Sequence, residues 1–318
     1  MILAGTALAA VAVGALRPVH HVAAAGSVRV PVLMYHYIRT NPLAGDRVGF
    51  NLSVTPADFA RQMSYLQRIG AHSVSMGDVM DAVGGKASLP ARSVVLTFDD
   101  GYADFATAAE PIMAWHGFRG TTYVCPGLLG KPNYMTTVQV QRVASLGSVI
   151  GAHTVHHVDL AKMSPGVAWA EIAGSRDQLR ALTSQPVTDF AYPFGHFNST
   201  AIAMVERAGF RSATTTMPGA VQSDLQRFLL PRVRVSGGES LAAFAASVNL
   251  EAEPPGEPTP PPTPLPAPAI AVETAMLSNA SRLAPASSVP AAPPRDEDRI
   301  PPGPAGLQHG DGLPLRLS

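Results

Sequence analysis

Short apolar runs alternate with helical stripes of apolar residues through the middle of the chain. Val94 to Phe98 is apolar and rich in β-branched residues, which is typical of a buried strand. Elsewhere apolar residues recur every three or four positions, as at Phe59, Met63 and Leu66, which is typical of a helix with one buried face. The expected strands span residues 29–36, 94–98, 121–124, 149–152, 190–192, 211–215 and 233–235. The expected helices span residues 56–69, 102–116, 136–146, 164–182, 199–208 and 241–248.

Strand-helix alternation of this kind predicts an α/β fold with a parallel sheet. Seven or eight such units favour a (β/α) barrel, and an open doubly wound sheet is the alternative. In both architectures functional groups gather at the carboxyl ends of the strands. We therefore expect the chemistry of this chain at that edge.

Both ends of the 318-residue chain differ in composition from its middle. Residues 2–16 are apolar and rich in small residues, but this stretch is too short for a comfortable membrane span. Residues 23–25 then offer a small-residue cleavage pattern. Residues 1–27 therefore predict a signal peptide or membrane anchor, although a basic start is missing. Residues 251–318 hold seventeen of the thirty prolines and predict a disordered tail. The folded domain is therefore expected over residues 28–250.

Charge and cysteine content exclude several classes of function. Lys and Arg number 23, equal to Asp and Glu, so no basic footprint for nucleic acid is present. The one cysteine, Cys125, excludes an internal disulfide and a four-cysteine zinc site, and it follows an apolar strand as a packed residue would.

Polar clusters follow three of the expected strands. They are Asp99-Asp100-Gly101, the run from His153 to His157, and Pro193-Phe194-Gly195-His196. His153 and His157 are four residues apart, so on a helical turn they would face the same way and bind one divalent metal together with a carboxylate. His153 with His156 is the competing pair. Three protein ligands would leave an open position for water, which is the catalytic arrangement.

The two adjacent aspartates indicate a division of labour. One carboxylate would hold the metal, and the other would take a proton from a metal-activated water that attacks an acyl carbon. An isolated Asp-Asp-Gly would instead be read as a solvated turn.

Three segments together resemble the motifs of the polysaccharide deacetylases, the NodB-homology group or fourth carbohydrate esterase family. They are Thr97 to Tyr102, His153 to His157, and Tyr192 to Gly195. The resemblance implies a deformed (β/α)7–8 barrel and a divalent metal, with Zn²⁺ the leading candidate and Co²⁺ or Ni²⁺ as alternatives. It also implies the residue roles: Asp99 as general base; Asp100, His153 and His157 as metal ligands; and the Phe194 N–H as an oxyanion donor, with Tyr192, Pro193 and Gly195 shaping the groove beside it.

Two departures from the family pattern concern an arginine and a histidine. Ala191 stands where an arginine usually pairs with the base, and we expect Arg232 to supply the guanidinium from another strand. The usual late acid histidine is missing before the tail. Val32 to His36 resembles the first strand of the circularly permuted branch, which includes exported poly-N-acetylglucosamine deacetylases of biofilm systems, so His36 is the expected acid.

These observations predict a metal-dependent deacetylase of an N-acetylglucosamine polysaccharide, either poly-N-acetylglucosamine or peptidoglycan. We expect an exported monomer that is extracellular, wall-associated or anchored facing outward, with an acetylated polysaccharide as its partner and no nucleic acid. The alternatives are an O-acetyl esterase on xylan or exopolysaccharide and a glycan-binding module without turnover.

Overall fold

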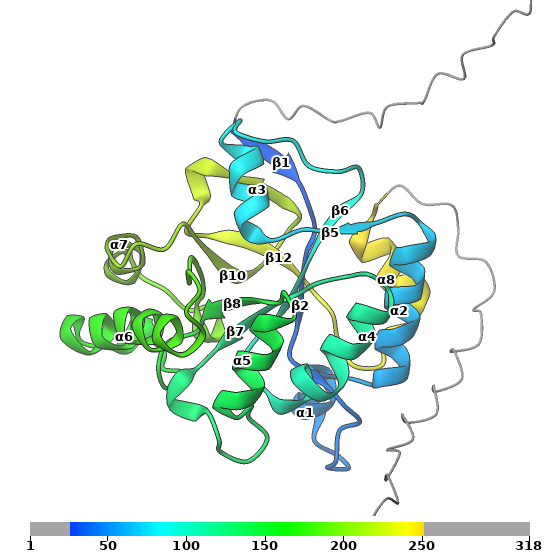
Figure 1. The fold of residues 1–318 in the computed structure, drawn as a ribbon, viewed down its shortest axis with the longest axis horizontal. Helices are drawn as coiled ribbons and strands as arrows, with labels where there is room; N and C mark the ends of the chain where they lie inside the picture. Colours follow the sequence, from blue (N-terminus) through cyan, green and yellow to red (C-terminus); the bar gives the residue numbers. More distant parts are fainter. Residues whose placement is uncertain (1–25, 251–318) are drawn as a thin grey trace, which may run out of the picture. The chain divides into compact units, whose positions relative to one another are not determined.

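Seven parallel strands close into a barrel at the centre of the computed structural model, which describes residues 26–250 (Figure 1). Their order around the ring is β2, β12, β10, β9, β8, β7 and β6, and β6 pairs back onto β2. The strands are β2 Val32–Tyr35, β6 Ser93–Phe98, β7 Thr121–Val124, β8 Val149–Ala152, β9 Asp189–Ala191, β10 Ser212–Pro218 and β12 Leu230–Arg234. The barrel prediction is confirmed, and the open-sheet alternative is wrong.

The first and last strands of the barrel are neighbours. Strand β2 lies between β12 and β6, where Leu33 pairs with both Val233 and Leu96, and Tyr35 pairs with Phe98. The residues that follow β2 and β6 therefore emerge side by side. The short β5, His72–Ser73, adds to the outer side of β6.

Helices surround the barrel, with α2, α4 and α8 on one flank and α6 and α7 on the opposite one (Figure 1). They are α1 Arg47–Leu52, α2 Pro56–Arg68, α3 Met76–Val83, α4 Glu110–Trp115, α5 Thr137–Ser145, α6 Pro165–Thr183, α7 Ser199–Arg207 and α8 Leu241–Val248. The hydroxyl of Thr55 accepts from the Asp58 N–H at the start of α2, and the Asn198 side chain does the same for Ala201 at α7. Such side chains satisfy free N–H groups at a helix start.

The helix predicted over residues 102–116 forms over residues 103–115, but its first half is not a regular α-helix. A π-helical turn spans Phe105–Ala109, and the regular α4 begins only at Glu110. Pro111 explains the difference, since it has no N–H to donate and its ring clashes with the carbonyl four residues earlier. The wider turn moves that carbonyl away.

Apolar packing forms two clusters of buried side chains. The larger one fills the space between the barrel and helices α2, α4, α5, α6, α7 and α8. The smaller one lies under α3 and includes Val32, Met76, Val95 and Leu230. A helix-covered barrel of this kind holds strand ends rigidly, which is what a catalytic site requires.

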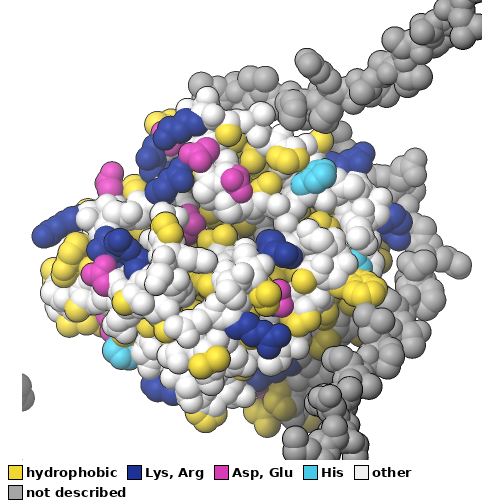
Figure 2. All heavy atoms as spheres, in the orientation of Figure 1, with side chains coloured by type: hydrophobic (Ala, Val, Ile, Leu, Met, Phe, Trp, Pro, Cys, Tyr) yellow, Lys and Arg dark blue, Asp and Glu magenta, His cyan; other side chains and the backbone are white. Residues whose placement is uncertain are grey.

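Two small strand pairs complete the fold. β1, Ser27–Arg29, pairs antiparallel with β11, Val221–Ser223, and β3, Tyr37–Ile38, pairs parallel with β4, Ser53–Val54. The predicted segments 1–27 and 251–318 lie outside the described residues, apart from residues 26 and 27. Within the described part, every helix is too short or too polar to cross a membrane. Basic side chains on the face in Figure 2 stand in small groups with acidic ones among them.

Candidate metal centre and catalytic site

The two adjacent aspartates leave the carboxyl end of β6 in different backbone conformations. The Asp99 N–H donates to the carbonyl of Tyr35, 3.0 Å away, so Asp99 continues the strand ladder. Asp100 turns into the left-handed region with φ of 75°, and Gly101 follows with φ of 78°. A Cβ on Gly101 would stand 3.2 Å from the Val124 side chain, so a larger residue would have to displace that side chain and adopt a strained positive φ. The two carboxylates consequently have different partners.

Asp100 meets the two predicted metal-binding histidines. Its Oδ1 lies 3.3 Å from Nε2 of His153 and 3.1 Å from Nε2 of His157. The candidate ligand atoms of these three residues all lie within 4.8 Å of one another. Burial would raise the pKa of Asp100, but the two imidazoles outweigh it and hold that pKa well below its ordinary value.

The residues of this cluster fit a divalent cation. Asp100 Oδ1 is buried and has no hydrogen-bond partner among residues 26–250. The Nδ1 of His153 donates to the carbonyl of Ala191 at 2.7 Å, which leaves the Nε2 lone pair facing Asp100. One carboxylate oxygen and two imidazole nitrogens suit Zn²⁺ and related transition metals, and three protein ligands leave a coordination position open.

The histidines converge through a strand-end turn and not through the expected helix. No helix covers residues 153–157, and Thr154 and His157 have φ of 60° and 57°. The competing His153–His156 pair is not brought together. His156 turns away and is 57% exposed, with its Nδ1 2.7 Å from Glu171 of α6. The left-handed residues reverse the chain tightly enough to aim His157 back at Asp100.

Asp99 is held by the guanidinium of Arg232 from β12. The pair is bidentate, with both N–H···O distances 2.7 Å, and the two residues are 3% and 1% exposed. Arg232 also donates to the Thr215 carbonyl and to the Thr97 hydroxyl. Burial would raise the pKa of Asp99, but Arg232 together with His153 and His36 holds that pKa below its ordinary value. Arg232 thus provides the guanidinium that the family pattern would place at position 191, where this chain has alanine.

His36 follows β2 and lies beside Asp99. Its Nε2 is 3.9 Å from Asp99 Oδ2. Burial lowers the pKa of His36, and the neighbouring Asp99 and Asp100 offset this only in part. A histidine with a lowered pKa gives up its proton more readily once protonated.

The third polar cluster forms a short turn after β9. Phe194 has φ of 60°, is 54% exposed, and its ring centroid lies 4.5 Å from that of His157. Gly195 has φ of 72°, and a Cβ there would collide with the Thr216 side chain. Tyr192 and Pro193 are buried, with Tyr192 packed between Phe190 and Phe197. They therefore support the turn from beneath and do not line the surface.

Comparison with known proteins identifies the family. Residues 86–213 match the family model described as polysaccharide deacetylase. This chain contains a polysaccharide deacetylase domain. As a deacetylase it is a hydrolase, and the resemblance seen in its motifs is confirmed.

Several polysaccharide deacetylases share most of the folded part of the chain. YxkH of Bacillus subtilis (strain 168), named for this family, is 29% identical over 220 residues, which are 69% of this chain and 76% of that protein. The deacetylase PplD of Streptococcus pyogenes, solved in complex with acetate, is 29% identical with a TM-score of 0.65, and the match covers 70% of this chain and 98% of PplD. The poly-β-1,6-N-acetyl-D-glucosamine N-deacetylase of Escherichia coli (strain K12) is 25% identical, with 62% of this chain matching 36% of that protein.

Sequence reasoning missed Glu171, which braces the histidine turn of this deacetylase. Its carboxylate accepts from the His156 N–H at 2.8 Å and faces the His156 ring. A signal was present, since an acid lies on the apolar face of α6 beside Ala168 and Ile172. An acid on a buried helix face needs a partner, and the histidine run offers one.

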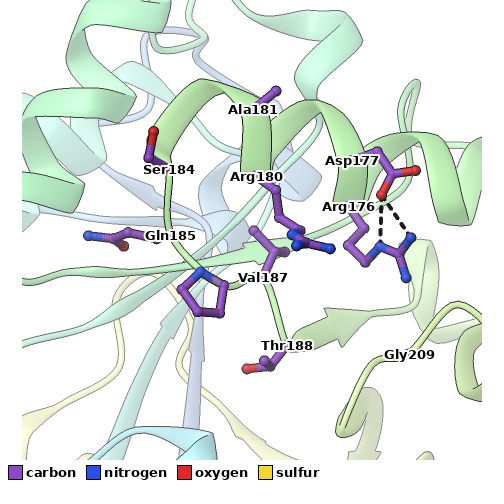
Figure 3. Close-up of a pocket in the computed structure, with 10 residues that line it drawn as sticks. Arg176, Asp177, Arg180, Ala181, Ser184, Gln185, Val187, Thr188 and Gly209 are labelled. Carbon is purple, nitrogen blue, oxygen red and sulfur yellow. Dashed lines mark hydrogen bonds and ion pairs between the residues drawn. The ribbon is translucent and has the colours of Figure 1, made fainter.

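A hollow of about 580 Å³ borders the amino ends of β9 and β10 (Figure 3). It is lined by the end of α6, by the segment before β9 and by Gly209 before β10. Arg180 points into it, while Arg176 turns to pair with Asp177 (Figure 3). Because it borders the amino ends of the strands, it is separate from the metal centre.

Proposed function

We propose that this deacetylase removes acetyl groups from an N-acetylglucosamine polysaccharide, with poly-N-acetylglucosamine or peptidoglycan as the substrate. The observation that carries the proposal is the pairing of two adjacent carboxylates with two different partners, Asp100 with a histidine pair and Asp99 with a buried guanidinium. The similarity to an N-deacetylase of poly-β-1,6-N-acetyl-D-glucosamine supports the substrate class.

Asp100, His153 and His157 are the proposed metal ligands, and Zn²⁺ is the proposed metal. When bound there, a divalent cation would polarise the acetyl carbonyl and lower the pKa of a water molecule. The buried position of Asp100 and His153 limits bulk water around the acetyl group, which strengthens every charge interaction in the site.

Asp99 is the proposed general base and His36 the proposed acid. As the water oxygen bonds to the acetyl carbon, the water proton passes to the Asp99 carboxylate, which Arg232 keeps ionised. The bond between the acetyl carbon and the nitrogen then breaks, and protonated His36 donates to the leaving nitrogen. The products are acetate and a free amine.

The turn after β9 is the proposed partner of the oxygen that gains negative charge. Oriented backbone donors stabilise such an oxygen because they need no reorganisation during the reaction. We assign this role to the Phe194 N–H, on a turn that Gly195 and the buried Tyr192 and Pro193 keep in shape. The same turn places the exposed Phe194 ring at the rim of the site.

Export of the protein, its position outside the cell, its action as a monomer and the three-part division into residues 1–27, 28–250 and 251–318 stay predictions from sequence. Export rests on the composition of residues 1–27 and agrees with a polymeric substrate that lies outside the cell.

Acetate release from N-acetylglucosamine oligomers by the full chain tests the proposal. We expect release that stops with chelator and returns when Zn²⁺ is added back. Asp100→Asn should lose bound metal and activity together, whereas Asp99→Asn should keep the metal and lose activity. Release only from O-acetylated xylan, or tight glycan binding without any acetate, would refute the proposed reaction.

A further inference from the structure

A pocket of about 730 Å³ lies beside the β3–β4 pair, away from the metal ligands. The chain between β3 and the first turn of α2 forms almost all of its wall, and Gly238 closes one side. Neither the metal centre nor the proposed proton transfers use any of these residues.

One side of the pocket depends on close packing between α1 and two glycines. α1 rests on the Gly237–Gly238 pair, where the Gly237 N–H donates to the Asn51 carbonyl at 3.2 Å. A Cβ on Gly237 would collide with the carbonyl oxygens of Phe50 and Ser53, and one on Gly238 would stand 2.8 Å from the Phe50 ring. Two glycines are therefore what allows α1 to sit here.

The loop before α1 is fastened by its own side chains. The amide of Asn41 donates to the Leu43 and Asp46 carbonyls at 3.2 and 3.0 Å. The Asp46 carboxylate caps α1 by accepting from the Gly49 N–H at 2.9 Å. The pocket is thus preformed, which reduces the entropy that a ligand would lose on binding.

A continuous line of contacts joins the pocket to the metal centre. Ser53, in the pocket wall, is the register partner of Tyr37. The Tyr37 ring stacks on Tyr102 with centroids 3.7 Å apart, and Tyr102 comes two residues after the metal ligand Asp100. The pocket is therefore linked to the metal centre through residues in direct contact.

The pocket wall combines apolar carbon with hydrogen-bonding groups. Phe50 is 50% exposed and Leu43 is 64% exposed, while the side chains of Asn51 and Thr40 also line the wall. The Ser53 hydroxyl is buried and has no hydrogen-bond partner among residues 26–250. A pyranose ring matches this combination, since its C–H face packs on an aromatic ring and its hydroxyl and acetamido groups pair with amides and hydroxyls.

We propose that this pocket is a second sugar-binding subsite, which holds an N-acetylglucosamine unit of the chain some distance from the unit that is deacetylated. The inference rests on the proposed function, because it assumes a polymer of N-acetylglucosamine as substrate. It assigns recognition of substrate length to the segment between β3 and α2.

The test compares kcat/KM of the metal-loaded full chain on the N-acetylglucosamine dimer and hexamer. Phe50→Ala and Asn51→Ala remove a ring and an amide from the pocket wall. Val48→Ala is the matched control, because Val48 lies on the same helix, is 70% exposed and does not line the pocket. We expect about a tenfold loss on the hexamer for each pocket variant, equivalent to about 1.4 kcal/mol, with the dimer unchanged. The control should leave both substrates unchanged.

Equal losses on dimer and hexamer, or no loss on either, would overturn the subsite. If the wild-type protein released no acetate from any oligomer, the proposed function would fail, and binding of the hexamer measured by calorimetry would decide the subsite by itself. Weaker hexamer binding by Phe50→Ala than by Val48→Ala would then support it, and equal binding would overturn it.

Discussion

Replacing Arg232 with methionine tests the pair that prepares the proposed base. The change keeps much of the apolar volume and removes a guanidinium that is 1% exposed. Asp99 would lose both of its 2.7 Å hydrogen bonds and stay buried at 3% exposure. The Thr215 carbonyl would lose a 2.8 Å donor as well.

The expected cost follows from leaving a buried charge without its partner. Breaking such a pair from one side typically destabilises a protein by about 3–5 kcal/mol. Asp99→Asn alone should cost less, because an amide can still accept from Arg232. In the double variant no buried carboxylate remains, so its loss in free energy of unfolding should be smaller than the sum of the single losses by about 1–3 kcal/mol.

The pH dependence of stability tests the Asp99–Arg232 pair independently. In the wild-type protein the pKa of Asp99 is held below its unfolded value, so the pair contributes stability above the unfolded pKa of about 4, and this is lost as pH falls through the folded pKa. Without Arg232, only His153 and His36 oppose burial, and we expect the pKa of Asp99 to rise above the unfolded value. The variant is then penalised at neutral pH, and the penalty disappears as pH falls toward about 4.

Urea unfolding of the chelated full chain at neutral pH and near pH 4 measures both effects. Activity of metal-loaded Arg232→Met should also fall, because a protonated Asp99 cannot take a proton. Strictly additive losses in the double variant, together with a stability gap that does not narrow on acidification, would show that Arg232 does not hold Asp99 ionised. Arg234→Met is the control, since Arg234 lies on the same strand and is exposed.

Two further predictions concern residues around the histidine turn. Glu171→Ala should weaken metal affinity by about 10–100-fold, measured by competition with a chelator, because His156 would no longer fix the turn that carries His157; partial recovery in Glu171→Gln is expected, and unchanged affinity would leave Glu171 a purely structural acid. Cys125 is fully buried and burial raises the pKa of its thiol, so a thiol reagent should modify it only after unfolding; rapid labelling of the native protein would contradict the packing described here.

The strands of the barrel could be predicted because their signal is local. Val94 to Phe98 is buried at every position, and a short β-branched run of that length bounded by a turn is typical of a buried strand. The segment from β3 to β4, which includes α1, could not be predicted from the sequence in the same way. Its strands are two residues long, and α1 buries none of its residues, so its position is decided by contacts with Gly237 and Gly238.

The metal ligands were identified from spacing, but the reason given for their convergence was wrong. A helical turn would bring His153 and His157 together through its own geometry, whereas the chain uses left-handed residues and a brace from α6. Spacing in sequence limits which side chains can meet. Backbone conformations with positive φ outside glycine depend on the surrounding structure and leave little trace in residue identity.

The closure of the barrel explains how Arg232 and His36 can both reach Asp99. Within the barrel β6 lies between β2 and β7, yet an inward-pointing side chain on a further strand can still reach across a narrow barrel. Arg232 does so from β12, and its guanidinium also contacts Thr97 on the wall of β6. The base requires a cation at hydrogen-bonding distance, and that cation can come from β12 as well as from the end of β9. A family motif that lacks its arginine at one strand end is therefore evidence to search the inward-facing positions of the other strands before turnover is excluded.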